Sequence, residues 1–126
     1  MGKQRTGDEH IRFDGMPIGH LLGDYWAWNS SDLLVNTERG SFSEFIVSAA
    51  LDLDLSGTKV DWGPYDVSFP YHWVCGTEPR DEVRIEVKSA AYLQSWEQHK
   101  PSSISFSIRP ARAWDPALGY YGELKR

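Results

Sequence analysis

The sequence predicts a domain of the α/β (α+β) class, in which a mixed β-sheet of about four strands is flanked by helices. Residues 82–88 alternate apolar and charged side chains, and residues 103–108 alternate apolar side chains with serines, as half-buried strands do. Over residues 42–50, apolar side chains recur at the spacing of one helix face. The helical patterns precede the strand patterns along the chain, so we expect the helices to pack on one sheet.

The N-terminal segment, residues 1–15, is charged and has no periodicity, and we expect it to be flexible. Residues 16–126 then form a single domain, because a chain of 126 residues suits one hydrophobic core. Residues 20–28 carry the pattern of a short helix. Ser30 or Ser31 is expected to cap a second short helix that ends near residue 35.

The clearest helix follows Arg39-Gly40-Ser41, with apolar residues at i, i+3, i+4, i+7 and i+8: Phe42, Phe45, Ile46, Ala49 and Ala50. Ser41 is expected to be the N-cap, with Glu44 three residues later completing a capping box. At 100° per residue, Glu44 points nearly opposite the apolar face. The helix should end between residues 52 and 55.

The strand patterns fall in the second half of the chain. Residues 59–62 and 65–69 are expected to be strands, residues 76–81 a turn, and residues 82–88 the strand that completes a hairpin. Residues 90–98 are expected to be partly helical, and residues 103–108 to be the last strand. A loop with Trp-Asp-Pro and Gly-Tyr-Tyr-Gly follows. A sheet of this kind usually continues, so we expect a C-terminal truncation.

Composition narrows the class of protein. The net charge of −5 counts against an extensive nucleic-acid interface, although it leaves room for a carboxylate site that binds a cation. One cysteine, Cys75, excludes an internal disulfide and a cysteine-rich zinc site. The sequence has no signal-peptide pattern and no long apolar run. We therefore expect a cytoplasmic protein without a membrane partner.

Three residues carry the chemistry. Glu86 and Lys88 lie two positions apart at the end of a strand, which places both side chains on one face about 6–7 Å apart. Asp66 lies in the preceding strand, and the hairpin brings it toward Glu86. Asp66 and Glu86 are then suited to hold one Mg²⁺ or Mn²⁺ ion, because Mg²⁺ commonly takes one or two protein carboxylates. Lys88 beside them can orient water or stabilise charge.

A Glu-x-Lys triplet also arises by chance on a solvated strand face, so its context matters. Pro64-Tyr65-Asp66 precedes it by about twenty residues, a helix with Glu44 lies upstream, and residues 89–96 follow directly with Gln94 near the same cleft. This layout resembles the PD-(D/E)xK (restriction-endonuclease-like) nuclease superfamily over residues 16–115. Arg39-Gly40 with Glu44 is similar to its archaeal Holliday-junction resolvase branch, and residues 85–96 are similar to uncharacterised bacterial members.

The resemblance implies roles for individual residues. Asp66 and Glu86 would be metal ligands, Lys88 catalytic and Glu44 an auxiliary metal ligand. For Glu44 the alternative is the capping-box role. Gln94 and Arg39 are candidates for substrate binding, with ordinary solvated side chains as the alternative. The tryptophans are expected in the core or an interface, with base stacking by one of them as the alternative.

The sequence thus predicts a nuclease that uses Mg²⁺ or Mn²⁺ to hydrolyse phosphodiester bonds in DNA. Nucleases that cut both strands often pair subunits, so a homodimer is one expectation. The alternative is an inactive nucleic-acid- or protein-binding module on the same fold. A third reading is a structural domain whose charged strand face is simply solvated.

Overall fold

The computed structural model describes residues 2–61, 63, 65–70 and 82–108, together with two C-terminal strands at 111–115 and 120–125. The elements run in the order β1 (His10–Phe13), β2 (Met16–Leu21), α1 (Leu22–Ser30), α2 (Asn36–Ala50), β3 (Val67–Phe69), β4 (Val83–Ile85), β5 (Ala111–Asp115) and β6 (Tyr120–Lys125). The mixed α+β class is confirmed. Within the described residues, however, the strands form three antiparallel pairs, β1–β2, β3–β4 and β5–β6, and no four-stranded sheet.

The first hairpin, β1–β2, was not predicted, and half of it lies in the segment expected to be flexible. Asp14 and Gly15 form its turn with positive φ angles of 47° and 75°. An Asp-Gly pair favours this geometry, because both central residues of a type I′ turn need φ above zero. Further upstream, the Gln4 amide donates to the carbonyl of Leu55 at 2.6 Å and to that of Gly57 at 2.9 Å, so the N-terminal arm contacts residues 55–57.

Helix α2 begins at Asn36, five residues before the predicted start, so Ser41 lies inside the helix. The capping-box prediction for Ser41 and Glu44 is therefore wrong. The residues before Ser41 tolerate helical backbone, including Gly40 at a modest cost. The predicted second short helix before residue 35 is also absent, because residues 33–35 form a turn into α2. Asp52, with φ of 53°, ends the helical path after Ala50.

The apolar residues of α2 are more exposed than Glu44, although Phe45 lines a pocket together with it. Phe42, Phe45 and Ile46 are 43%, 54% and 51% exposed, whereas the Glu44 side chain is only 17% exposed. The helical periodicity thus gave the correct relation between Glu44 and the apolar residues. It did not show which of the two faces would turn inward.

The hairpin of β3 and β4 holds the one buried apolar residue of the described chain, Val67. The two strands pair in the register Val67↔Ile85 and Phe69↔Val83. Both predicted strands are confirmed here in shorter form. Residues 59–61, 90–98 and 103–108 have no regular secondary structure, although a strand, a partial helix and a strand were predicted there.

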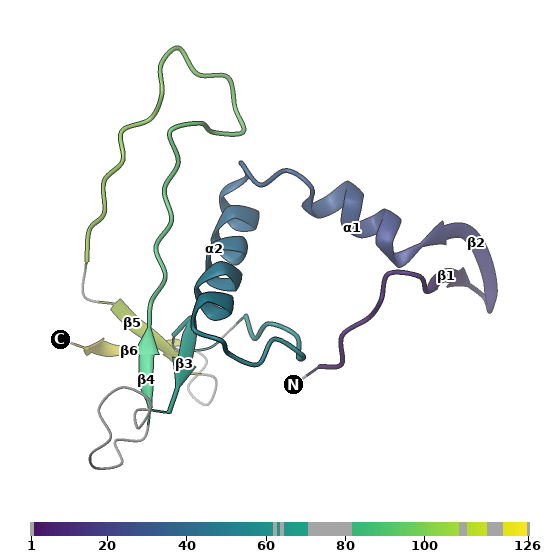
Figure 1. The fold of residues 1–126 in the computed structure, drawn as a ribbon, viewed down its shortest axis with the longest axis horizontal. Helices are drawn as coiled ribbons and strands as arrows, with labels where there is room; N and C mark the ends of the chain where they lie inside the picture. The colour runs from purple at the N-terminus through teal and green to yellow at the C-terminus, as the bar shows by residue number, and fades with distance from the viewer. Residues whose placement is uncertain are drawn as a thin grey trace.

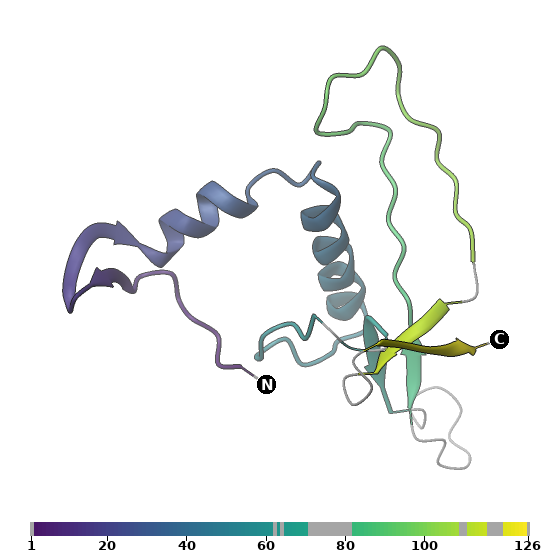
Figure 2. The same cartoon turned by 180° about the vertical axis from the view of Figure 1, so that it is seen from behind.

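The molecule is open. Figures 1 and 2 show α1 and the β1–β2 hairpin extending to one side of α2, and the segment after β4 running out as a long loop before it returns to β5. The accessible surface is 10922 Å² for a mass of 14.4 kDa. A compact protein of this mass exposes about 6,800 Å², so roughly 4,000 Å² more surface than usual meets solvent.

The C-terminal segment differs from the sequence expectation. The sequence predicts a loop for the stretch with Trp-Asp-Pro and Gly-Tyr-Tyr-Gly. In the structure, the two ends of this stretch form β5 and β6. They pair in the register Ala111↔Lys125 and Trp114↔Tyr121, with an irregularity between Arg112 and Trp114. Short aromatic runs beside Pro and Gly are ambiguous between loop and strand, so tertiary pairing decided the outcome.

Candidate metal centre

Asp66 and Glu86 lie at the same end of the β3–β4 hairpin, Asp66 just before Val67 and Glu86 just after Ile85. Asp66 lies outside the regular ladder, because its N–H donates at 3.1 Å to the carbonyl of Ile85, which is already the partner of Val67. Both Asp66 and Val67 therefore lie across from Ile85, as two residues opposite one do in a β-bulge.

The Asp66 carboxylate is anchored on the neighbouring strand. Its Oδ2 atom accepts a hydrogen bond from the backbone N–H of Val87 at 2.6 Å. Val87 lies between Glu86 and Lys88, so this bond ties Asp66 to the backbone that carries the other two candidates. The second carboxylate oxygen, Oδ1, accepts no hydrogen bond from the described residues. It is thus the oxygen with which Asp66 would bind a cation.

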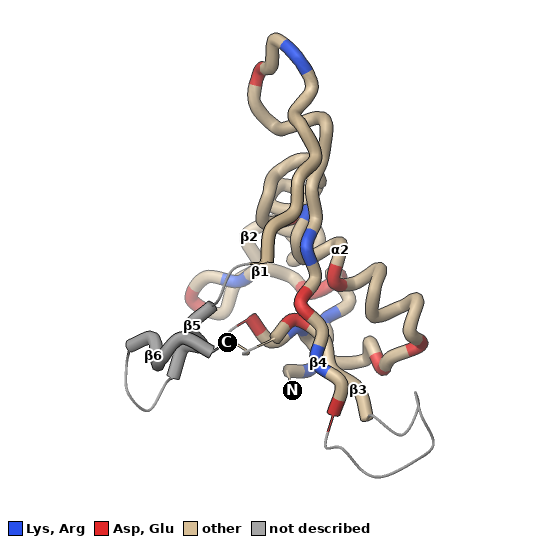
Figure 3. Tube along the Cα trace, turned by 90° about the vertical axis from the view of Figure 1, so that its left-hand side faces the viewer, with Lys and Arg blue, Asp and Glu red and all other residues tan. Residues whose placement is uncertain are grey.

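Lys88 is paired with Glu86. The Nζ atom of Lys88 donates to Oε1 of Glu86, and each side chain is 56% exposed. This hydrogen bond, with the charges of Glu86 and Asp66, raises the pKa of Lys88 above its ordinary value, although partial desolvation opposes the rise. Lys88 therefore responds to both carboxylates and stays protonated at neutral pH. Acidic and basic positions lie close together between α2 and β4 in Figure 3.

Glu44 contacts a residue that the sequence analysis did not single out. Its Oε2 lies 3.1 Å from Nζ of Lys59, which also lies 3.4 Å from Oδ1 of Asp61 and 3.3 Å from the Ser41 hydroxyl. Burial alone would lower the pKa of Lys59, but hydrogen bonds and attraction to Glu44 and Asp61 outweigh it, so the pKa is raised. No signal in the sequence marks Lys59, because it meets Glu44 only through the fold.

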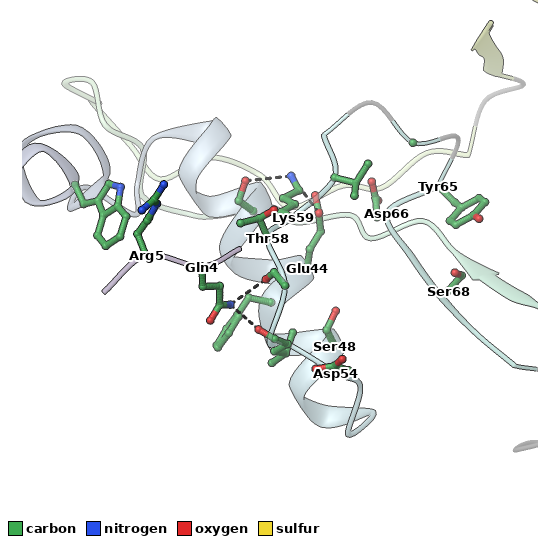
Figure 4. Close-up of a pocket in the computed structure, with 17 residues that line it drawn as sticks. Gln4, Arg5, Glu44, Ser48, Asp54, Thr58, Lys59, Tyr65, Asp66 and Ser68 are labelled. Atoms are coloured by element: carbon green, nitrogen blue, oxygen red, sulfur yellow. Dashed lines mark hydrogen bonds and ion pairs between the residues drawn. The ribbon is translucent and has the colours of Figure 1, made fainter. Parts of the chain in front are cut away.

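A pocket of about 800 Å³ is lined by Glu44, Lys59 and Asp66, among other residues. In Figure 4, Arg5 lies toward one end and Asp66 toward the other, with Lys59 and Glu44 between them. Glu86 and Lys88 are not among the residues that line it. The structure therefore brings Glu44 and Asp66 to one cavity, and Asp66 and Glu86 to one end of the hairpin. No group of three or more His, Cys, Asp or Glu side chains in the described part of the chain is arranged to hold a metal.

Arg39 and Gln94, the two candidates for substrate binding, contact each other. Nη1 of Arg39 donates to the Leu34 carbonyl at 2.9 Å and to Oε1 of Gln94 at 3.5 Å. Gln94 in turn donates to the Ala91 carbonyl at 2.9 Å. The Nε atom of Arg39 is buried and has no hydrogen-bond partner in the structure. These two side chains link the start of α2 to the loop after β4, fifty-five positions further along the chain.

Several residues used in the sequence argument lie outside the described part of the chain. They are Pro64, Cys75 and the turn at 76–81. The carboxylates of Asp66 and Glu86 are of the donor type that Mg²⁺ prefers. The predicted roles of Asp66, Glu86, Lys88 and Glu44 in metal binding remain predictions.

Two further observations bear on the identity of the chain. Among the described residues, none of the helices has the length and apolar character needed to cross a membrane. Comparison with protein-family models, with curated proteins and with solved structures finds no match to this chain. Its function must therefore be argued from its own residues.

Proposed function

We propose that this protein is a nuclease that uses Mg²⁺ or Mn²⁺ to hydrolyse phosphodiester bonds in DNA, on a restriction-endonuclease-like core in a cytoplasmic setting. The observation that carries the proposal is the hydrogen bond from the Val87 N–H to Asp66, which holds the Asp66 carboxylate at the end of the hairpin beside the strand of Glu86 and Lys88. Two neighbouring carboxylates repel one another unless a cation lies near them. Here Lys88 pairs with Glu86, and a divalent ion would bind to both carboxylates.

The residues have distinct tasks in this proposal. Asp66, fixed by the Val87 N–H, and Glu86 would hold the ion. A bound Mg²⁺ supplies an acidified water and neutralises charge on the phosphoryl oxygens. Lys88, which lies beside Glu86, would stabilise negative charge on the phosphate as a point cation or orient the attacking water. Glu44 would add a ligand from α2 through the pocket that it shares with Asp66.

The test is cleavage of plasmid, single-stranded and branched DNA in Mg²⁺ or Mn²⁺ by the wild-type protein and by Lys88→Ala. Lys100→Ala is the matched control, because Lys100 is an exposed lysine outside the site. We expect Lys88→Ala to lose about 100- to 1000-fold in rate, as the loss of one charge-stabilising group commonly costs, and Lys100→Ala to cleave like wild type. Equal cleavage by all three proteins would remove Lys88 from the mechanism.

Metal uptake is measured separately by calorimetry with Mn²⁺. Glu86→Gln should abolish uptake, while Glu97→Gln, an exposed carboxylate on the loop after β4, should leave it unchanged. If wild-type protein takes up no Mn²⁺, the enzyme reading fails.

A binding module without catalysis is the second candidate. The exposed apolar face of α2 favours it, since apolar patches on a surface often mark contacts with other macromolecules. A homodimer, which is common among nucleases that cut both strands, would use such a face as well.

A further inference from the structure

The pocket beside Asp66 contains an aromatic ring that the proposed chemistry does not use. Trp26 of α1 lines this cavity together with Arg5, while Asp66, Glu44 and Lys59 line the remainder. The volume of about 800 Å³ lies within the range of roughly 300–1,000 Å³ that is typical of ligand sites. One cavity therefore combines a flat apolar surface with cations and carboxylates.

Trp26 is held in place from one side. A Cβ atom at Gly7 would lie 3.2 Å from Cζ3 of the Trp26 ring, so the Gly7 backbone packs against the indole. The Gly23 N–H donates to the Gly7 carbonyl at 2.8 Å, which fixes this contact to the start of α1. Gly7 has a φ of 93°, a conformation that favours glycine. Trp26 nevertheless remains 40% exposed and is one of the residues that line the pocket.

We infer that Trp26 is a stacking platform for an unpaired base of a single-stranded DNA segment whose phosphates run toward Lys59 and Asp66. The inference deepens the proposed function and rests on it. Every base has a flat face that stacks on an indole regardless of sequence, and duplex bases are already stacked and out of reach. Arg5 on the same wall supplies a cation for the backbone of the strand.

The charged residues that line the pocket are the cations Arg5 and Lys59 and the carboxylates Glu44, Asp54 and Asp66. Lys59 is already paired with Glu44 and Asp61, whereas Arg5 forms no ion pair within the described residues, although its charge acts on Glu9. Arg5 is therefore the cation that a phosphate meets at the tryptophan end. At the opposite end, the phosphate would need the metal that Asp66 is proposed to hold.

The chain provides a matched control for Trp26. Trp28 lies on the same helix and is 83% exposed, yet it does not line the pocket and instead contacts Tyr25 at a ring separation of 6.5 Å. A base that stacked on any exposed indole would use Trp28 at least as readily. Only binding of a base inside the pocket would depend on Trp26 and not on Trp28.

The experiment measures the binding of a fluorescently labelled single-stranded oligonucleotide by anisotropy, in Mg²⁺ and in a Lys88→Ala background, with the integrity of the DNA checked on a gel. We expect Trp26→Leu to weaken binding roughly 5- to 150-fold, which corresponds to the loss of one stacked base. Trp28→Leu should change it less than about 2-fold, and Trp26→Phe, which keeps an aromatic face, should stay within about 5-fold of the parent. A duplex of the same sequence should bind less tightly to the parent protein and should not distinguish Trp26→Leu from Trp28→Leu.

The outcomes separate this inference from the proposed function. Equal binding of single strands by Trp26→Leu and Trp28→Leu, or no measurable binding by the parent, overturns the base site even if the wild-type protein cleaves DNA. Loss of binding in both Trp26→Leu and Trp26→Phe, with unchanged circular dichroism, also overturns stacking as the cause. Binding that depends on Trp26 while the wild-type protein fails to cleave supports the base site and rejects the nuclease.

Discussion

Oδ2 of Asp66 accepts a hydrogen bond from the backbone N–H of Val87 at 2.6 Å. Asp66 and Val87 lie twenty-one positions apart in the chain, and this contact extends the β3–β4 pairing past the ends of both strands. It also fixes the orientation of the Asp66 carboxylate beside Glu86 and Lys88. Oδ2 of Asp66 thus has a structural role that does not depend on what Oδ1 binds.

This dual role predicts different outcomes for two substitutions of Asp66. Asp66→Asn keeps an oxygen that accepts from Val87, so we expect the free energy of unfolding to change by less than about 0.5 kcal/mol. Asp66→Ala removes the acceptor and should cost about 0.5–1.5 kcal/mol, as a hydrogen bond of this kind commonly does. Both should lose Mn²⁺ uptake. Urea denaturation and calorimetry measure the two properties, and equal stability of Asn and Ala variants would contradict the structural task.

The pKa of Lys88 should depend on Glu86. In the metal-free protein, the hydrogen bond to Glu86 raises this pKa above the ordinary lysine value of about 10.5, so we expect Glu86→Gln to lower it toward that value. The sign for stability follows: while the Glu86 carboxylate is charged, the pair contributes at pH values below the unfolded pKa of Lys88, and its contribution is lost as pH rises through the higher folded pKa. A divalent ion held by Glu86 would act in the opposite direction, because its positive charge lowers the pKa of a neighbouring lysine.

Titration of the lysine Nζ resonances by NMR, in wild type and Glu86→Gln, checks this directly. Lys100→Ala identifies a lysine signal that should be unaffected. A Lys88 pKa that is the same in both proteins would show that Glu86 does not hold the ammonium in solution.

Lys59 should compete with a divalent cation for Glu44. Its ammonium lies 3.1 Å from the Glu44 carboxylate and compensates that charge. If Glu44 is an auxiliary ligand, Lys59→Met frees the carboxylate, and Mn²⁺ should bind more tightly than in wild type. The pair is partly exposed, so its loss should cost only about 0.2–1 kcal/mol of stability. Calorimetry on Lys59→Met and Glu44→Gln separates the roles, since unchanged affinity in both variants removes Glu44 from the metal site.

Exposed Ile46 of α2 and buried Val67 of β3 should respond differently to mutation. Ile46 is 51% exposed, so Ile46→Lys should change the free energy of unfolding by less than about 0.5 kcal/mol. Val67 is the buried apolar residue of the described chain, and Val67→Ala should cost about 1.5–3 kcal/mol through lost burial and a residual cavity. Thermal or chemical unfolding measures both. A large loss of stability in Ile46→Lys would mean that the apolar face is covered in solution.

Arg39 and Gln94 should be energetically coupled. Their hydrogen bond of 3.5 Å joins α2 to the loop after β4, and Gln94 also bonds to Ala91. A double-mutant cycle with Arg39→Met and Gln94→Ala should therefore give a non-zero coupling energy. Glu97→Ala, an exposed residue on the same loop, serves as the control in a second cycle with Arg39→Met. Additive effects in the first cycle would show that the contact does not persist in solution.

The sequence by itself determined the local features of this protein. Alternation over residues 82–88 and 65–69 identified the hairpin that carries Asp66, Glu86 and Lys88, because the period of two is a property of the strand alone. Helical spacing identified most of α2 and the angle between Glu44 and the apolar residues. The Asp14-Gly15 pair carries an equally clear sequence signal for a turn, although the turn is not among the predicted elements.

Only the tertiary structure decided the relations between distant segments. It left the apolar residues of α2 more exposed than Glu44, paired Glu44 with Lys59, joined Arg39 to Gln94, and opened a pocket between Trp26 and Asp66. These outcomes depend on which surfaces contact each other. Periodicity shows which face of a helix or strand is apolar, but it does not show which segment that face contacts. Side-chain spacing therefore predicted Asp66, Glu86 and Lys88, while the surroundings that would give them a function came from contacts across the chain.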